Sequence, residues 1–144
     1  MKIERRLGTR LIVNLVLLAY WFPALIADTV IQCQKVDGVY IFTDYSTNWC
    51  SVLILVHLIT AIVITAMDLK YNGATETLIL IRNRVTHMTI IGSISVTLNW
   101  FTFSVSKWTL QSTHEHLVNT IVMSISVLSL NSHFRKRDFW LGES

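Results

Sequence analysis

Two residues far apart in the sequence, Thr47 and His116, have side chains that could work together in catalysis. Thr47 lies in the polar stretch TDYSTNWC, just before a long apolar block, and His116 lies in STHEHLVNT, before another apolar block. Histidine accepts protons near neutral pH, and a threonine hydroxyl becomes a nucleophile when such a base takes its proton. Such a pair could cleave an ester. The alternative is structural, because Thr47 could simply cap its helix, with Ser46 and Asn48 as competitors.

Four apolar blocks would have to position these residues. They cover about 11–27, 49–67, 85–106 and 117–130, and each approaches the ~20 residues that cross a bilayer as a helix. Of the 144 residues 52% are hydrophobic and only 15% are charged. The apolar residues form continuous runs rather than helical or strand periods, which indicates segments with apolar surroundings on every side. The sequence therefore predicts an all-α integral membrane bundle of about four helices, with residues 1–144 as a single domain.

The basic residues indicate the orientation of this bundle. Lysines and arginines number four before the first block, then one, three and one between successive blocks, and three after the last block. Because cytoplasmic loops carry the excess of basic residues, both termini should be cytoplasmic, and Thr47 and His116 should both face the outer side. Nucleic acid is not expected as a partner, since the basic residues lie on three separate edges rather than in one patch.

The first block also fits a cleaved signal peptide, because basic residues precede an apolar core that ends near Ala27. The core is long for a signal peptide, and Leu25 is a poor residue three positions before the cleavage site. We therefore expect an uncleaved first helix. Either interpretation places Asp28 and the following loop on the outer side.

Two short stretches carry a family resemblance. YSTNW at 45–49, followed by an apolar block, and HLVNTIVMSISVLSL at 116–130 resemble the androgen-induced and androgen-dependent multispan membrane proteins. The rolling stone branch is more similar, with its Tyr-x-Thr-Asn-Trp pattern and a later histidine that precedes an asparagine and an apolar helix. Members of this family typically have about six spans, whereas this sequence has four apolar blocks. If further walls are needed, a homo-oligomer would supply them.

The resemblance implies an activity. The androgen-induced branch hydrolyses fatty acid esters of hydroxy fatty acids with a membrane-embedded threonine and histidine, which fall on Thr47 and His116. The resemblance thus implies a lipid ester hydrolase in the plasma membrane or endoplasmic reticulum, surrounded by membrane lipids. The rolling stone branch is associated with myoblast fusion, so the alternative is a non-enzymatic membrane protein with a role in cell fusion or as a scaffold. No G-x-S-x-G, H-E-x-x-H, Walker or C-x-x-C motif occurs, and no cofactor is expected.

His57 lies well inside the second block, and an ionisable residue at that depth is a candidate for function. The alternative is a neutral imidazole bonded to a serine or threonine across the bundle. His57 follows Thr47 by ten residues, about 15 Å of helix. It therefore cannot be the base for Thr47.

Other polar residues near the predicted outer side have two interpretations each. His114 and His116 form an H-x-H pair, but their rings diverge at a helix start and no third ligand is evident. We therefore expect no metal site, and we expect His114 to lie in solvent. Asn48 and Asn119 could donate to an oxyanion, or each could cap its helix.

The two cysteines also allow two arrangements. Cys33 and Cys50 both fall on the predicted outer side, where a disulfide can form. Such a bond would tie the first outer loop to the second helix. Alternatively, Cys50 is buried within that helix as a free thiol.

Overall fold

The computed structural model describes residues 2–35, 46–71, 76–103 and 113–130, all of them helical. The α-helices are α1 (Lys2–Lys35), α3 (Ser46–Tyr71), α4 (Glu76–Phe103) and α6 (Asn119–Leu130). One turn of π-helix, η1 (His114–Val118), leads into α6. The described part of the chain contains no strand, so the all-α prediction is confirmed.

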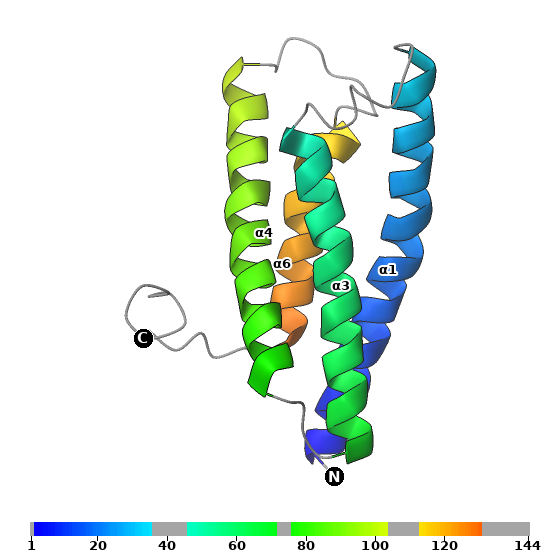
Figure 1. The fold of residues 1–144 in the computed structure, drawn as a ribbon, viewed down its shortest axis with the longest axis vertical. Helices are drawn as coiled ribbons and strands as arrows, with labels where there is room; N and C mark the ends of the chain where they lie inside the picture. The colour runs from blue at the N-terminus through cyan, green and yellow to red at the C-terminus, as the bar shows by residue number, and fades with distance from the viewer. Residues whose placement is uncertain (1, 36–45, 72–75, 104–112, 131–144) are drawn as a thin grey trace.

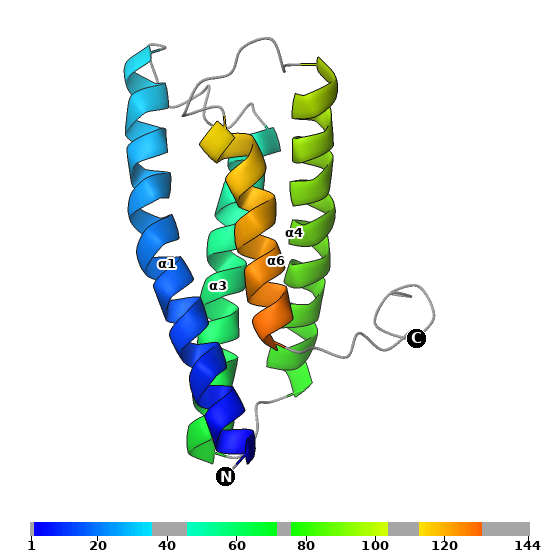
Figure 2. The ribbon, with the colours of Figure 1, turned by 180° about the vertical axis from the view of Figure 1, so that it is seen from behind.

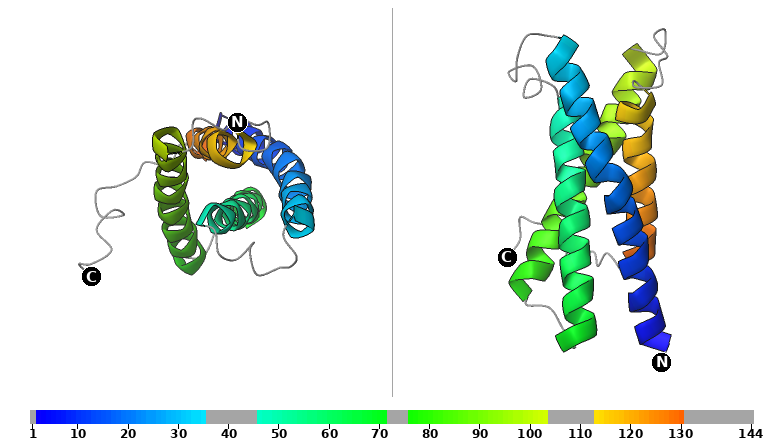
Figure 3. Two further views of the ribbon diagram at one scale, coloured as in Figure 1. Left: turned by 90° about the horizontal axis from the view of Figure 1, so that it is seen from above. Right: turned by 90° about the vertical axis from the view of Figure 1, so that its right-hand side faces the viewer.

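The four helices run up, down, up and down, so that each is antiparallel to the next (Figure 1). The view from behind shows the short α6 between α1 and α4 (Figure 2). Seen along the bundle, α4, α6 and α1 form an arc, and α3 lies in its hollow (Figure 3). α3 accordingly packs against all three other helices. It is the central element of the bundle.

Two helices are long and apolar enough to cross a membrane. The qualifying segments are Arg5–Ile31 in α1 and Asn48–Tyr71 in α3, with 27 and 24 residues. Both helices extend beyond the apolar blocks from which they were predicted, because hydropathy marks only the apolar part of a helix. The finding indicates membrane association without fixing the number of crossings.

The bundle differs from a soluble helical bundle in that it buries many polar side chains and exposes many large apolar ones. An apolar cluster is buried along the contacts of α3 with its neighbours (Trp21, Cys50, Ile54, Leu58, Val96, Val122, Met123). Among these side chains lie buried polar residues from all four helices (Asn14, His57, Thr86, Thr89, Ser93, Asn119, Ser126). Large apolar side chains face outward instead, with Ile12 63% exposed, Ile91 67% and Leu128 80%. Soluble monomers rarely expose apolar surface on this scale.

Candidate functional site

The two residues predicted for catalysis lie on elements at the same end of the bundle. Thr47 is the second residue of α3, and His116 is in η1. The start of α3 and η1 lie at one end (Figure 1), and η1 contacts both α3 and α4. We call this end the mouth. The side chain of Thr47 lies outside the described part of the structure, so its approach to His116 stays a prediction.

The position of His116 is set by two contacts with α4. Its ring stacks on that of Trp100, with centroids 5.8 Å apart and planes inclined by 13°. Its main-chain carbonyl accepts a hydrogen bond of 2.5 Å from the Thr97 hydroxyl, which also lies 2.7 Å from the hydroxyl of Thr120 on α6. A π-helical turn such as η1 is rare and is often found at functional sites. Here the turn carries a histidine whose ring is held in a fixed plane.

His114 points the opposite way, toward α1, so the predicted divergence of the two rings is confirmed. Its ring stacks on Trp21 with centroids 5.8 Å apart and an angle of 19°, and the Tyr20 ring is equally close. Its Nδ1 lies 3.1 Å from a carboxylate oxygen of Asp28, an ion pair when the imidazole is protonated. The expectation that His114 lies in solvent is wrong. Two aromatic side chains of α1, which the sequence could not place nearby, cover its ring.

The two asparagines near the mouth are both buried, Asn48 in α3 and Asn119 at the junction of η1 and α6. Asn119 has φ −50° and ψ −52°, which are helical angles, whereas a capping residue has non-helical ones. The interpretation of Asn119 as a helix cap is therefore wrong, because the π-turn before it already continues into α6. A role of either amide as an oxyanion donor stays a prediction.

A chain of hydrogen bonds crosses the middle of the bundle. His57 Nε2 is 2.9 Å from Ser126 Oγ, and Ser126 donates its hydroxyl proton to Asn14 Oδ1 at 2.6 Å. Since Ser126 has only one proton, it must accept from His57, which therefore carries its hydrogen on Nε2. In the neutral imidazole Nδ1 then accepts from Thr86 Oγ1, 2.9 Å away. The hydrogen bonds therefore all point the same way. Thr86 of α4 donates to His57 of α3, His57 donates to Ser126 of α6, and Ser126 donates to Asn14 of α1.

We call these four residues the polar chain. The amide nitrogen of Asn14 continues it to the Arg10 carbonyl at 2.8 Å and to Ser129 Oγ at 3.2 Å. The interpretation of His57 as an imidazole bonded to serine and threonine across the bundle is confirmed. Of these four residues, only His57 could be recognised from the sequence as a candidate. Its partners depend on how each helix is rotated about its axis.

Cys50 is a free, buried thiol. Its Sγ lies 3.4 Å from the hydroxyl of Ser93 on α4, so the second alternative, burial in the helix, is confirmed for Cys50. The side chain of Cys33 lies outside the described part. Within the described residues, no group of three or more His, Cys, Asp or Glu could hold a metal ion.

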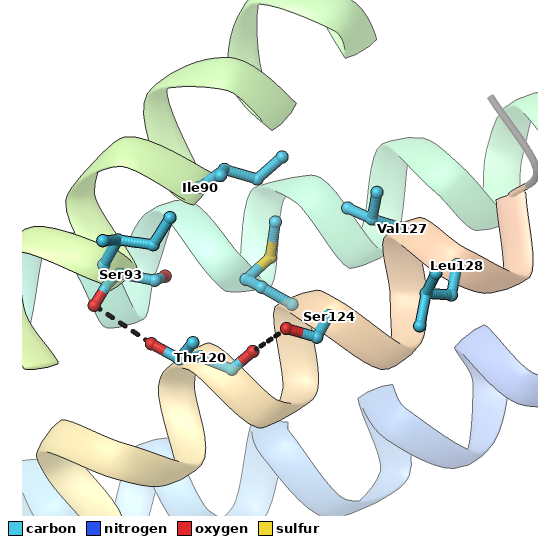
Figure 4. Close-up of a pocket in the computed structure, with 8 residues that line it drawn as sticks. Ile90, Ser93, Thr120, Ser124, Val127 and Leu128 are labelled. Carbon is cyan, nitrogen blue, oxygen red and sulfur yellow. Dashed lines mark hydrogen bonds between the residues drawn. The ribbon is translucent and has the colours of Figure 1, made fainter. Parts of the chain in front are cut away.

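A lateral groove of about 310 Å³ lies between α4 and α6. Its lining is mostly apolar, with three hydroxyl groups (Ile90, Ser93, Ile94, Thr120, Met123, Ser124, Val127, Leu128). Figure 4 shows that two of the hydroxyls already have partners within the wall: Thr120 donates to the Ser93 carbonyl at 3.1 Å, and Ser124 donates to the Thr120 carbonyl at 2.7 Å. The groove therefore presents a mostly apolar surface to a ligand. Its Thr120 end is one helical turn from His116.

No family model, no curated protein and no solved structure matches this chain. The similarity to the androgen-induced and rolling stone proteins therefore stays a prediction from two short stretches of sequence.

Proposed function

We propose that the chain is a multi-pass integral membrane protein whose four helices all cross the bilayer, with both termini cytoplasmic. The exposed apolar surface of the bundle supports this proposal, because α4 and α6 expose apolar side chains just as α1 and α3 do. The 28 residues of α4 correspond to about 42 Å of helix, and the 5 residues of η1 and 12 of α6 to about 25 Å. Both lengths are comparable with the ~30 Å hydrocarbon layer.

Labelling of single cysteines tests this topology. Cysteines introduced at positions 38, 73, 111 and 142, in a background without Cys33 and Cys50, are exposed to an impermeant thiol reagent on intact cells. We expect labelling at 38 and 111 only. Protection at 111 together with labelling at 38 would place His116 on the cytoplasmic side, about 30 Å from Thr47, and would rule out a catalytic pair.

At the mouth we propose a hydrolase site for lipid esters, with Thr47 as nucleophile and His116 as base. Three features support it: the start of α3 and η1 lie at one end of the bundle, the His116 ring is fixed by Trp100, and the lateral groove begins one turn away. An acyl chain already dissolved in the bilayer could enter this groove between α4 and α6. Its ester group would then lie near the mouth.

The reaction needs only water as a second reactant. His116 takes the proton of the Thr47 hydroxyl while the oxygen attacks the ester carbonyl. The bond to the hydroxy fatty acid breaks, and His116 returns the proton to the leaving alkoxide, which leaves an acyl-threonine. Water then attacks this ester, with His116 again accepting a proton and passing it to the threonine oxygen as the fatty acid departs.

Hydrolysis by the purified protein tests the proposed activity. Wild-type protein in nanodiscs should release fatty acid from a branched fatty ester of a hydroxy fatty acid, and Thr47→Ala and His116→Ala should each abolish release. Thr60→Ala is the matched control on α3, because the Thr60 hydroxyl bonds to carbonyls of its own helix. His87→Ala, on α4, is the control for loss of a histidine. Full activity in either mouth variant would exclude the mechanism.

The second candidate is a non-enzymatic membrane protein. The polar chain favours it, since His57 uses both ring nitrogens for bonds that join helices, and a bundle held in this way is suited to a scaffold. A fluorophosphonate probe separates the candidates. Covalent labelling at Thr47 supports the hydrolase, whereas folded protein that is not labelled supports the scaffold.

A further inference from the structure

The end of the bundle opposite the mouth has a groove of about 380 Å³ whose lining is strongly basic. Arg5, Arg6, Thr9 and Arg10 of α1 line it together with Ser129 of α6. Thr9 donates its hydroxyl to the Arg5 carbonyl at 2.9 Å, and Ser129 donates to the Ser126 carbonyl at 2.6 Å. The two hydroxyls are thus held by the helices, which leaves the guanidinium groups as the donors that a ligand would meet. We call this the arginine groove.

The positive charge of the arginine groove is not neutralised by the described part of the protein. Among the side chains that the structure describes, no carboxylate forms an ion pair with any of the three arginines. Arg6 and Arg10 are four residues apart and so lie on one face of α1, where like charges repel. An anion placed between them would remove this repulsion and would satisfy several N–H groups at once.

The level of the arginines along α1 indicates the kind of anion. Arg5 to Arg10 cover about 7.5 Å along α1, close to the ~5–7 Å thickness of one headgroup layer. Two residues further on, Ile12 faces outward from the helix, as expected for a side chain in contact with acyl chains. In the membrane orientation proposed above, the arginines are therefore at the level of lipid phosphates, and guanidinium groups bind phosphate oxygens with paired hydrogen bonds.

We propose that the arginine groove binds the phosphate of an anionic phospholipid in the cytoplasmic leaflet. Basic pockets between transmembrane helices on this side commonly hold such headgroups. The proposal rests on the membrane location proposed above and is independent of the hydrolase site. The same phosphate chemistry could come from a soluble ion, so the experiment includes both sources.

Native mass spectrometry of the full chain in detergent micelles tests the proposal, with titration by phosphatidylglycerol or phosphatidylcholine. Both lipids carry a phosphate, but only phosphatidylglycerol has a net negative charge. Arg6→Gln/Arg10→Gln should weaken phosphatidylglycerol binding roughly 20- to 30-fold, because each basic residue near an anionic surface contributes about fivefold. Lys70→Gln/Arg84→Gln is the matched control, since it removes two exposed charges outside the groove. It should leave binding within about twofold of wild type, because neither side chain lines the groove.

Four outcomes would overturn the assignment. Equal losses in the two double variants would show general surface attraction. Equal binding of the two lipids would show that net charge is not recognised. Displacement of phosphatidylglycerol by inorganic phosphate at similar concentration would show a site for soluble anions. Wild-type protein that binds neither lipid and stays dispersed without detergent would contradict the membrane location itself.

A second variant keeps the test valid if the glutamine variant does not fold, as judged by circular dichroism. Arg6→Lys/Arg10→Lys keeps both charges but lacks the planar fork of guanidinium. It should bind phosphatidylglycerol several-fold more weakly than wild type does. Wild-type affinity in this variant would contradict paired hydrogen bonds to the phosphate.

Discussion

Ser126→Ala should destabilise the bundle far more than Ser124→Ala, although both change the same residue type on α6. Ser126 is fully buried and bonds to two other helices, to His57 of α3 and Asn14 of α1. Ser124 is exposed and, among the described residues, bonds only to the Thr120 carbonyl of its own helix. The change in intrinsic helix propensity is the same at both positions. The difference between the variants therefore isolates the polar chain.

The expected magnitude follows from the bonds that are lost. Ser126→Ala removes two hydrogen bonds between helices, each worth about 0.6 kcal/mol and at most about 1.7 kcal/mol inside a membrane protein. His57 Nε2 and Asn14 Oδ1 are left buried without these partners, which adds to the cost. We expect the free energy of unfolding to fall by about 1–3 kcal/mol for Ser126→Ala. For Ser124→Ala the change should stay within about 0.5 kcal/mol.

Equilibrium unfolding in mixed micelles, with a rising share of dodecyl sulfate, measures both variants. Trp21 and Trp100 are buried in the bundle, so tryptophan fluorescence reports its opening. A double-mutant cycle of Ser126→Ala with His57→Leu should give non-additive losses, because the two changes remove the same bond. If Ser126→Ala costs no more than Ser124→Ala, the polar chain does not stabilise the fold and our reasoning is refuted.

Three further predictions concern individual side chains near the core. Trp21→Phe should cost about 1–2 kcal/mol because it removes the 3.0 Å hydrogen bond to the Ser51 carbonyl, and the exposed Trp49→Phe should cost less in the same unfolding assay. Gly92→Ala should raise stability by about 0.5–1 kcal/mol, since an added Cβ would lie 3.5 Å from the Cys50 sulfur, an ordinary contact; a loss would show that the contact is too tight. In a variant without Cys33, Cys50 should react with a maleimide only after unfolding by dodecyl sulfate, and labelling of the native protein would contradict the burial of Cys50.

The sequence predicts the helices well because each apolar block is a local property. Long apolar runs require that backbone groups be satisfied within the segment, and a helix does this without knowledge of its neighbours. The histidine in the second block could likewise be interpreted locally. An imidazole at that depth needs polar partners, and a bond to a hydroxyl across the bundle is one of the two interpretations that the sequence allows for His57.

Contacts between helices could not be predicted in the same way. Thr86 and Ser126 are two of many hydroxyl residues in their helices, and only the rotation of each helix selects them as partners of His57. His114 was misplaced for the same reason, because its environment depends on two aromatic residues almost a hundred positions earlier. The lateral groove and the arginine groove also form only where two helices meet.

The polar chain connects the stability of the bundle to the geometry of both ends. In a lipid environment apolar side chains gain little by facing one another, so directional bonds and close packing decide how the helices are rotated. Asn14, at the end of the polar chain, is one turn from Arg10 and bonds to Ser129. Arg10 and Ser129 both line the arginine groove. Ser126 lies on the same helix as Thr120. The Thr120 hydroxyl forms a hydrogen bond with the hydroxyl of Thr97, which also bonds to the His116 carbonyl. The rotation that the polar chain imposes on α1 and α6 therefore also determines which side chains face the arginine groove and the mouth.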